Sequence, residues 1–453
     1  MRVWRLRSTM ETSPIKLNNN ANYRERFAGD PPKESVVWPW LGQIRQEAYE
    51  RFQAIGFPTK GLEGWKYISL DPIMSASFVL AGGKSSQAAV SFKSQEENRL
   101  VFVDGVYSEE YSSTGFLPHG VFLGRLAENI EFTPDIVRPY LEQRLETETN
   151  AFSLINMFSF KDGAFIYVPK NISIDKPLNL FFVTSPTADA PQLFYPRILI
   201  VLGDRASAEV VAHFIGGASG KYFNNSDADI HLGEGAKLDY SYIQRESKGA
   251  FGFLSNRYTL KKESALNVLS FSEGGLLVRN ENQVAFTGEY ASASLKGLSV
   301  LSGESQTFHH AVVEHAVPHC TSRQFYKAIL TDKSKSEFNS LVHVHRGAEK
   351  SDSNQLNKNL LLSDFAQSYS RPQLKIEADD VACTHGATVG QLEKEELFYL
   401  RSRGFSEKLA RFVLTYGFAE EILEAFKPES LKTGLEALVS RELQRVTGEK
   451  ELV

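Results

Sequence analysis

The feature that most constrains how this 453-residue chain can fold is a region of roughly two hundred residues, starting near Phe160, with almost no helical periodicity. Short apolar runs alternate in it with Gly, Asn and Asp, which is typical of short strands joined by turns. In four of these turns a polar stretch is followed by an alanine and then by an alternating strand. These alanines lie 30, 29 and 26 residues apart and are Ala206, Ala236, Ala265 and Ala291.

A repeat of this length, whose spacing varies by a few residues, predicts a β-solenoid. In such a fold each coil of the chain buries its face only against neighbouring coils. A β-sandwich would also produce short strands and turns. We favour the solenoid because roughly two hundred strand-rich residues exceed what one ordinary sandwich holds. The expected fold class is therefore mainly β, with the core over residues 159–385.

The residues before this core predict a mixed α/β domain over residues 36–158. A helix is expected over Leu41–Ile55, because its apolar residues recur on one face and Gly56 follows as a C-cap. Strands are expected at Leu100–Val103 and at residues 121–123, and a second helix at Pro134–Leu145. Residues 1–35 are polar and predict a solvated tail.

The residues after the core, 386–453, predict a helical domain. A helix is expected from Gln391 to a C-cap at Gly404, and Ser406 can serve as the N-cap of the next helix. The apolar positions of these helices indicate a small bundle packed on the end of the solenoid, where it would cap the open edge. The alternative is a docking surface for another protein.

Composition excludes several classes of protein. A formal net charge of −5 gives no reason to expect nucleic acid, and 42% hydrophobic residues suffice for a core. No apolar run approaches the roughly 18 residues that a membrane span needs. Two cysteines make a disulfide framework implausible and indicate a reducing compartment. Without an extended Arg- and Ser-rich leader, a cytoplasmic location in a bacterium is favoured over an organelle stroma.

The candidate ligand residues are concentrated near the end of the β region. Both cysteines lie between residues 309 and 385, together with seven of the ten histidines. Cys383 and His385 are two residues apart, so a strand would point thiol and imidazole to the same face. His319 and Cys320 are neighbours that would diverge after Pro318, and Cys320 is as well explained as a small buried residue. The other histidines of this segment are His309, His310, His315, His343 and His345.

Cys383 and His385 form an incomplete site, because zinc enzymes usually show three protein ligands and neither H-E-x-x-H nor paired C-x-x-C is present. The missing ligands would come from a partner chain, from distant histidines or from inorganic sulfide. Soft sulfur with nitrogen suits iron or iron–sulfur chemistry. Nucleotide-binding and nucleophile-elbow motifs are also lacking, so the chain alone has no convincing catalytic set.

The end of the β region and the start of the helices read NQLNKNLLLSDFAQSYSRPQLKIEADDVACTHGATVGQLEKEELFYLRSRG. Weaker motifs are GFPTKGLEGWKY, NAFSLINMFSFKDGAFIYVPKN and VPHCTSRQFYKAIL. Together they resemble the SufB/SufD family, the scaffold subunits of the SUF iron–sulfur cluster assembly machinery. The chain resembles the SufD branch, because it has Cys383-Thr384-His385 where SufB typically has Glu-His-Glu.

The resemblance implies a right-handed parallel β-helix between an N-terminal domain and C-terminal helices. It also implies a SufB-like partner joined laterally, and a SufC-like ABC-type ATPase docked on the C-terminal helices. His385, with Cys383 in a supporting role, would then lie where a transient iron–sulfur cluster is built or iron is received, and His319 and Cys320 would be secondary metal candidates. A homodimer would form in the absence of the partner.

The competing class is a solenoid enzyme that acts on polysaccharide. Such an enzyme generally needs acidic residues clustered on one coil face, whereas Asp379 and Asp380 are adjacent in the chain. The expected function is therefore that of a non-enzymatic scaffold subunit.

Overall fold

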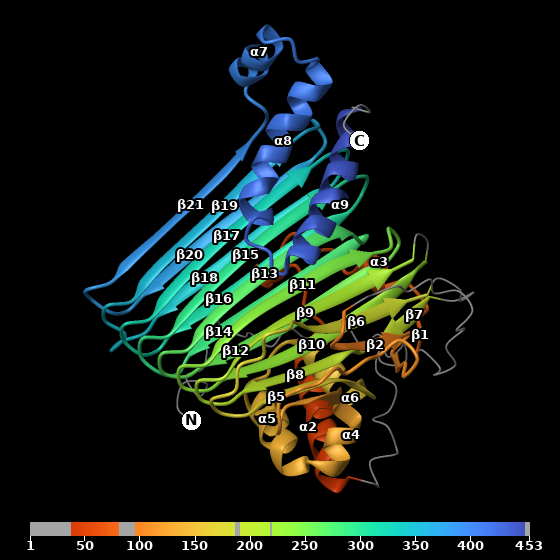
Figure 1. Ribbon diagram of the computed structural model, residues 1–453, viewed down its shortest axis with the longest axis vertical. Coiled ribbons are helices and arrows are strands. Elements are labelled where there is room, and N and C mark those ends of the chain that lie inside the picture. The colour runs from red at the N-terminus through yellow and green to blue at the C-terminus, as the bar shows by residue number, and fades with distance from the viewer. Residues whose placement is uncertain (1–37, 81–95, 186–190, 218–219, 449–453) are drawn as a thin grey trace.

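The computed structural model describes residues 38–80, 96–185, 191–217 and 220–448, and the predicted tail at 1–35 lies outside these ranges. Within them the protein is mainly β, as predicted, and two long sheets run along the molecule (Figure 1). Sheet A has eleven strands: β1 Val79–Leu80, β4 Phe122–Arg125, β5 Gly163–Val168, β7 Gln192–Phe194, β8 Arg197–Leu202, β10 Tyr222–Leu232, β12 Phe251–Leu260, β14 Leu277–Phe286, β16 Gln306–His315, β18 Lys335–Val344 and β20 Gln367–Ile376. Sheet B has ten: β2 Arg99–Val103, β3 Val106–Tyr107, β6 Leu178–Thr184, β9 Ser207–Gly216, β11 Lys237–Glu246, β13 Ala265–Gly274, β15 Ser292–Leu301, β17 Thr321–Leu330, β19 Asp352–Leu361 and β21 Ala382–Gly390.

The order of strands in the two sheets confirms the solenoid. From β8 onward even-numbered strands pair in sheet A and odd-numbered strands pair in sheet B, and every one of these pairings is parallel. Each coil therefore contributes one strand to each sheet. Antiparallel pairs occur where β2 meets β3 and where β4 meets β5, at the N-terminal end of the solenoid. A sandwich would instead consist largely of antiparallel hairpins.

The corner that leads into each strand of sheet B from β9 to β21 repeats the same backbone turn. One residue per corner has a positive φ, between 43° and 64°, and only one of the seven is a glycine. An αL conformation normally disfavours side chains, so its recurrence reflects the shape that the stacked coils impose. These residues are Arg205, Gly235, Glu263, Tyr290, His319, Lys350 and Asp380.

A column of small buried residues follows these turns, and it corrects the alanine repeat. Lys237 pairs with Ala265, so the third member of the column is the preceding residue, Ser264, and the predicted Ala265 was out by one position. The corner of the last coil differs, because it is followed by the larger and only partly buried Val381. The column, each member at most 1% exposed, is Ala206, Ala236, Ser264, Ala291, Cys320 and Ser351.

The N-terminal helices cover the outer face of sheet A. They are α2 Pro39–Ile55, α3 Asp71–Met74, α4 Leu126–Phe132, α5 Pro134–Thr147 and α6 Ala151–Ser159, with a 3-10 turn at Glu63–Trp65. Aromatic rings from this side, such as Phe152, pack against Phe253 of β12 at 4.6 Å between ring centroids. The expected helices and strands of this region are present. In α2, however, Ile55 is 45% exposed and does not join the buried stripe.

The C-terminal helices are α7 Lys394–Ser402, α8 Glu407–Leu423 and α9 Glu429–Thr447. Ser406 caps α8 as predicted, because its hydroxyl accepts a hydrogen bond from the backbone N–H of Leu409. The predicted position of the bundle was wrong. Helices α8 and α9 lie across the outer face of sheet B (Figure 1), where Phe271 and Leu298 meet them, and leave the end of the solenoid uncovered. Lys327 of β17 holds α8 there by donating to the carbonyl of Phe418 at 2.7 Å.

In the part of the chain that the structure describes, the last coil, β20 and β21, is consequently the open end of the solenoid. No residue of either strand is fully buried, whereas the inward residues of β19 are. Helix α7 follows this coil, and none of its residues is buried either. No helix in the described part of the chain is long and apolar enough to cross a membrane.

Replacing Phe271 by Ala tests the docking of α8 and α9 on sheet B. This side chain is 1% exposed, so its loss should lower the free energy of unfolding by about 3–5 kcal/mol. Phe365→Ala is the matched control, because that ring is 72% exposed and its removal should cost less than about 0.5 kcal/mol. Urea unfolding of both variants measures the difference, and equal losses would contradict the docking.

Candidate functional site

Cys383 and His385 lie together on β21, the strand that ends sheet B. The strand register pairs Cys383 with Ser353 and His385 with Gln355, and both partners are buried residues of the inward face. Side chains two residues apart on a strand share a face, so thiol and imidazole both point to the inside of the last coil. Because no coil follows, His385 is exposed and Cys383 is half-buried.

The column of inward side chains that ends at His385 changes from mainly apolar to polar along the solenoid. It begins with Val210, Tyr240, Val268 and Leu295 and continues with Gln324, Gln355 and His385. The Gln355 amide donates to the hydroxyl of Ser340 at 2.9 Å, and that hydroxyl donates to Gln324 at 2.8 Å. The amide oxygen of Gln355 has no hydrogen-bond partner among the described residues. It can therefore accept an N–H from the imidazole beside it and orient the ring.

The surroundings of Cys383 favour its protonated thiol form. Its side chain packs against the solenoid core, and burial raises the pKa of the thiol above its ordinary value of 9.0. The charge of Asp352 acts in the same direction, while a backbone hydrogen bond at Ser353 opposes it. Since a thiolate is the form that binds metal, loading of this residue would release a proton.

No third protein ligand completes this pair within the part of the chain that the structure describes. The group of three converging metal-binding side chains found there is Glu314, His343 and His345, which does not include Cys383 or His385. Cys383 and His385 thus present two possible donors, a candidate half-site, at an uncovered edge. Such a half-site can bind a soft ion or cluster once other donors are supplied.

His319 and Cys320 diverge as expected, but they do so at a tight corner and not on the extended segment that was expected after Pro318. His319 is the αL residue of that corner and stacks on Tyr290 at 4.7 Å between ring centroids. Cys320 is fully buried in the column of small residues, and its thiol donates a long hydrogen bond to the carbonyl of Gly288. Burial raises the pKa of this thiol to about 11. Both residues therefore have a local structural role.

The other histidines of the segment 309–385 divide between the two faces of sheet A. His309 points inward and contacts the hydroxyl of Ser299 at 3.0 Å, while its neighbour His310 points outward. His343 and His345 lie on the outer face, beside Glu314 of the preceding coil. Glu314 is a residue that the sequence did not reveal as a partner. Glu314 and His343 are one coil length apart in the sequence. This separation can be recognised as a contact only when the strand register is known.

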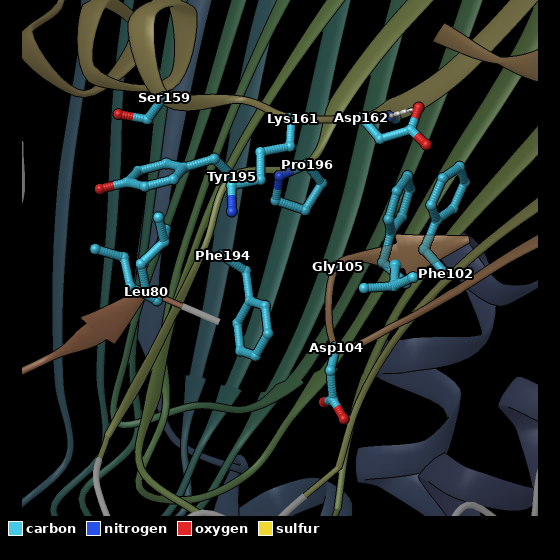
Figure 2. A pocket seen from close by; sticks show the side chains of 14 residues that line it. Leu80, Phe102, Asp104, Gly105, Ser159, Lys161, Asp162, Phe194, Tyr195 and Pro196 are labelled. Atoms are coloured by element: carbon cyan, nitrogen blue, oxygen red, sulfur yellow. Dashed lines mark hydrogen bonds between the residues drawn. The ribbon is translucent and has the colours of Figure 1, made fainter. Parts of the chain in front are cut away.

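A separate pocket lies at the other end of the solenoid, between β1, β2 and β7 (Figure 2). Its cavity holds about 80 Å³, well below the several hundred Å³ of ordinary ligand sites. Phe194 and Tyr195 line it on one side, and Phe102 and Gly105 on the other. None of the predicted site residues reaches this pocket.

Two family models match the chain and together span most of it. The model described as "SUF system FeS cluster assembly, SufBD core domain" matches residues 182–418. The model described as "SufBD protein N-terminal region" matches residues 33–180.

Curated relatives agree with these matches. An iron–sulfur cluster assembly SufBD family protein of Synechocystis is 30% identical over 87% of this chain and 90% of its own length. The iron–sulfur cluster assembly protein SufD of Escherichia coli is 29% identical over 88% of this chain and 92% of its own. The protein SufB of Bacillus subtilis is 24% identical over 63% of this chain and 61% of its own.

The raised pKa values of the two thiols predict how they react. At neutral pH, iodoacetamide should alkylate Cys383 more slowly than a model thiol, because less of it is thiolate. Its rate should still rise as the pH passes above the ordinary thiol value of 9.0. The fully buried Cys320 should react more slowly again. Peptide mass spectrometry measures both rates, and urea-unfolded protein is the control in which they should become equal. A Cys383 that outpaces the model thiol would contradict the burial.

Proposed function

Because the chain belongs to the SufBD family of SUF iron–sulfur cluster assembly proteins, we propose that it is a non-catalytic scaffold subunit. With a SufB-like partner it would hold iron or a nascent cluster, as cargo, at their shared edge. The half-site of Cys383 and His385 on the uncovered inward face of β21 carries this proposal. Thiolate sulfur and imidazole nitrogen are donors that iron and iron–sulfur clusters accept.

We place the chain on the SufD side of the family. The relative named SufD aligns over nearly its whole length, whereas the relative named SufB aligns over less than two thirds of its own. The sequence Cys383-Thr384-His385 also departs from the Glu-His-Glu that is typical of SufB. A SufD-like subunit would retain the histidine and depend on its partner for the remaining donors.

The open end of the solenoid is the surface that we assign to the SufB-like partner. The inward residues Ile376 and Val389 are apolar and 43% and 48% exposed, because no further coil covers them. The edges of β20 and β21 also present unpaired backbone groups. A second solenoid can cover both features by extending the sheets, which is how coils already stack within this chain. A second copy of the chain would use the same end when the partner is lacking.

Helix α7 and the exposed side of α8 are the surface that we assign to a SufC-like ABC-type ATPase. Phe398 and Tyr399 of α7 are 73% and 53% exposed, and no residue of this helix is buried. A helix with exposed aromatic residues and no buried side chain fits a docking element. ATP-driven motion would reach the half-site through the short connection between β21 and α7.

The proposed compartment is the cytoplasm, since both cysteines are free. The polysaccharide-enzyme alternative lacks support. Asp380 is an αL corner residue that is ion-paired with Lys350. Asp379 and Asp380 therefore do not form the pair of same-face carboxylates that glycoside hydrolysis requires.

His385→Ala in the complex reconstituted with the SufB-like and SufC-like subunits tests the half-site. Cluster formation, followed by visible absorption, should fall by about tenfold or more, since one of two donors from this chain is lost. His319→Ala is the matched control, because that histidine is an exposed corner residue outside the half-site. Normal cluster formation by His385→Ala would sink the role given to this residue.

Two charge substitutions test the two docking surfaces separately. Val389→Asp should weaken binding of the SufB-like subunit by about tenfold or more, because the new carboxylate would be buried without a partner when that subunit covers it. Binding of the ATPase should be unchanged. Phe398→Asp should give the opposite result. Pull-down and calorimetry with each partner measure both effects. Loss of both partners in either variant would argue against separate surfaces.

A further inference from the structure

A second group of metal-binding side chains lies on the outer face of sheet A, away from Cys383 and His385. Glu314 ends β16 on this face, because its neighbour Val313 points into the core. In the next coil His343 is its register partner, and Val342 and Val344 on either side of His343 are core residues. His345 is two residues further along the same face and bonds through its backbone N–H to the carbonyl of His315. The stacking of coils, and no local motif, brings the three together.

The donor atoms of this group converge on one point. Oε2 of Glu314 is 3.1 Å from Nδ1 of His343 and 2.5 Å from Nε2 of His345. All three donor atoms lie within 4.8 Å of one another. Two ligands at about 2.0–2.1 Å from a tetrahedral ion would be roughly 3.3 Å apart, so little movement separates this arrangement from a coordinated one.

The surroundings suit a bound cation. The three side chains are between 12% and 23% exposed, which shields them partly while leaving one side open. Burial alone would raise the pKa of Glu314, but hydrogen bonds from His343 and His345 outweigh it and lower the pKa to about 2. The nearby Lys375 is engaged with Glu377 at 3.0 Å and so does not neutralise Glu314.

We propose that Glu314, His343 and His345 bind a divalent transition-metal ion, of the class of Zn²⁺ or Fe²⁺. Two imidazoles and one carboxylate are a donor set that these ions accept, with the remaining positions open to water or an external ligand. In the bound state each ring would present an unprotonated nitrogen to the metal, Nδ1 of His343 and Nε2 of His345, and would keep its N–H on the other ring nitrogen. Glu377, 3.5 Å from Nε2 of His343, can hold that ring in orientation from the other side.

This site is independent of the proposed cluster edge. It lies on the outer face of sheet A and is formed by one chain, whereas Cys383 and His385 lie on the inner face of sheet B and need a partner. Metal binding at the triad can therefore be measured on the isolated chain. A triad that binds no metal would not contradict the proposed cluster function. A chain without the cluster function could still bind metal at the triad.

The test is a titration of the metal-free full-length chain with Co²⁺ alone, followed by equilibrium dialysis and visible absorption. The wild type and Cys383→Ser should bind one equivalent with the same d–d spectrum and no sulfur-to-cobalt charge-transfer band. His343→Ala and His345→Ala should each weaken binding by about 100-fold or more, since even loss of a residue behind a ligand typically costs roughly 10–100-fold. His319→Ala is the matched control and should bind normally.

Glu314→Gln guards against a variant that merely fails to fold, because the amide keeps the shape and can still accept a hydrogen bond. It should also lose Co²⁺ binding, while its circular dichroism matches that of the wild type. Unchanged Co²⁺ binding in both histidine variants would overturn the proposal. So would a wild-type chain that binds no Co²⁺, in which case the triad is a structural ion pair only.

Discussion

Each coil of this solenoid can bury its inward face only against the coils beside it, and most of the structure follows from that constraint. Parallel, in-register pairing repeats the same corner in every coil, and the backbone there adopts αL even at Arg205, Glu263 and Lys350. A left-handed residue costs about 1–2 kcal/mol, so the stacking has to outweigh that cost at each of these corners. The small buried residue that follows the turn, such as Cys320, recurs for the same reason.

The same constraint leaves one coil without a neighbour. Helices on both outer faces cover the sheets sideways, through α6 on sheet A and through α8 and α9 on sheet B, but they do not replace the missing coil. An uncovered parallel edge with inward apolar residues is an aggregation hazard for a protein that works alone. It is a suitable feature for a subunit whose partner supplies the next coil. The position of the half-site on that coil thus follows from the fold.

The sequence predicted what depends on local periodicity. The coil repeat, the cap at Ser406 and the shared face of Cys383 and His385 all follow from spacings of a few residues or of one turn. The one-residue slip at Ala265 arose because coil length varies, which spacing alone cannot resolve. Contacts between coils could not be predicted for the same reason. Buried ion pairs could not be predicted either, and an example is the pair of Arg144 and Asp227, which joins α5 to β10 across 83 residues. The apolar stripe of α8 likewise predicts that one side of the helix is buried. It does not predict the surface against which that side packs.

The change from apolar to polar residues along the inward column has a thermodynamic consequence for the proposed half-site. A partner that stacks on β21 would remove Cys383 and His385 from water, together with the unpaired amide oxygen of Gln355. Burying polar groups without partners opposes association, whereas a bound iron or cluster would satisfy thiolate and imidazole at once. Cargo and partner would then strengthen each other's binding by the same factor, as linkage requires. The geometry of the open coil is therefore suited to a partner that binds tightly when the cargo is present and separates more easily once the cargo has left.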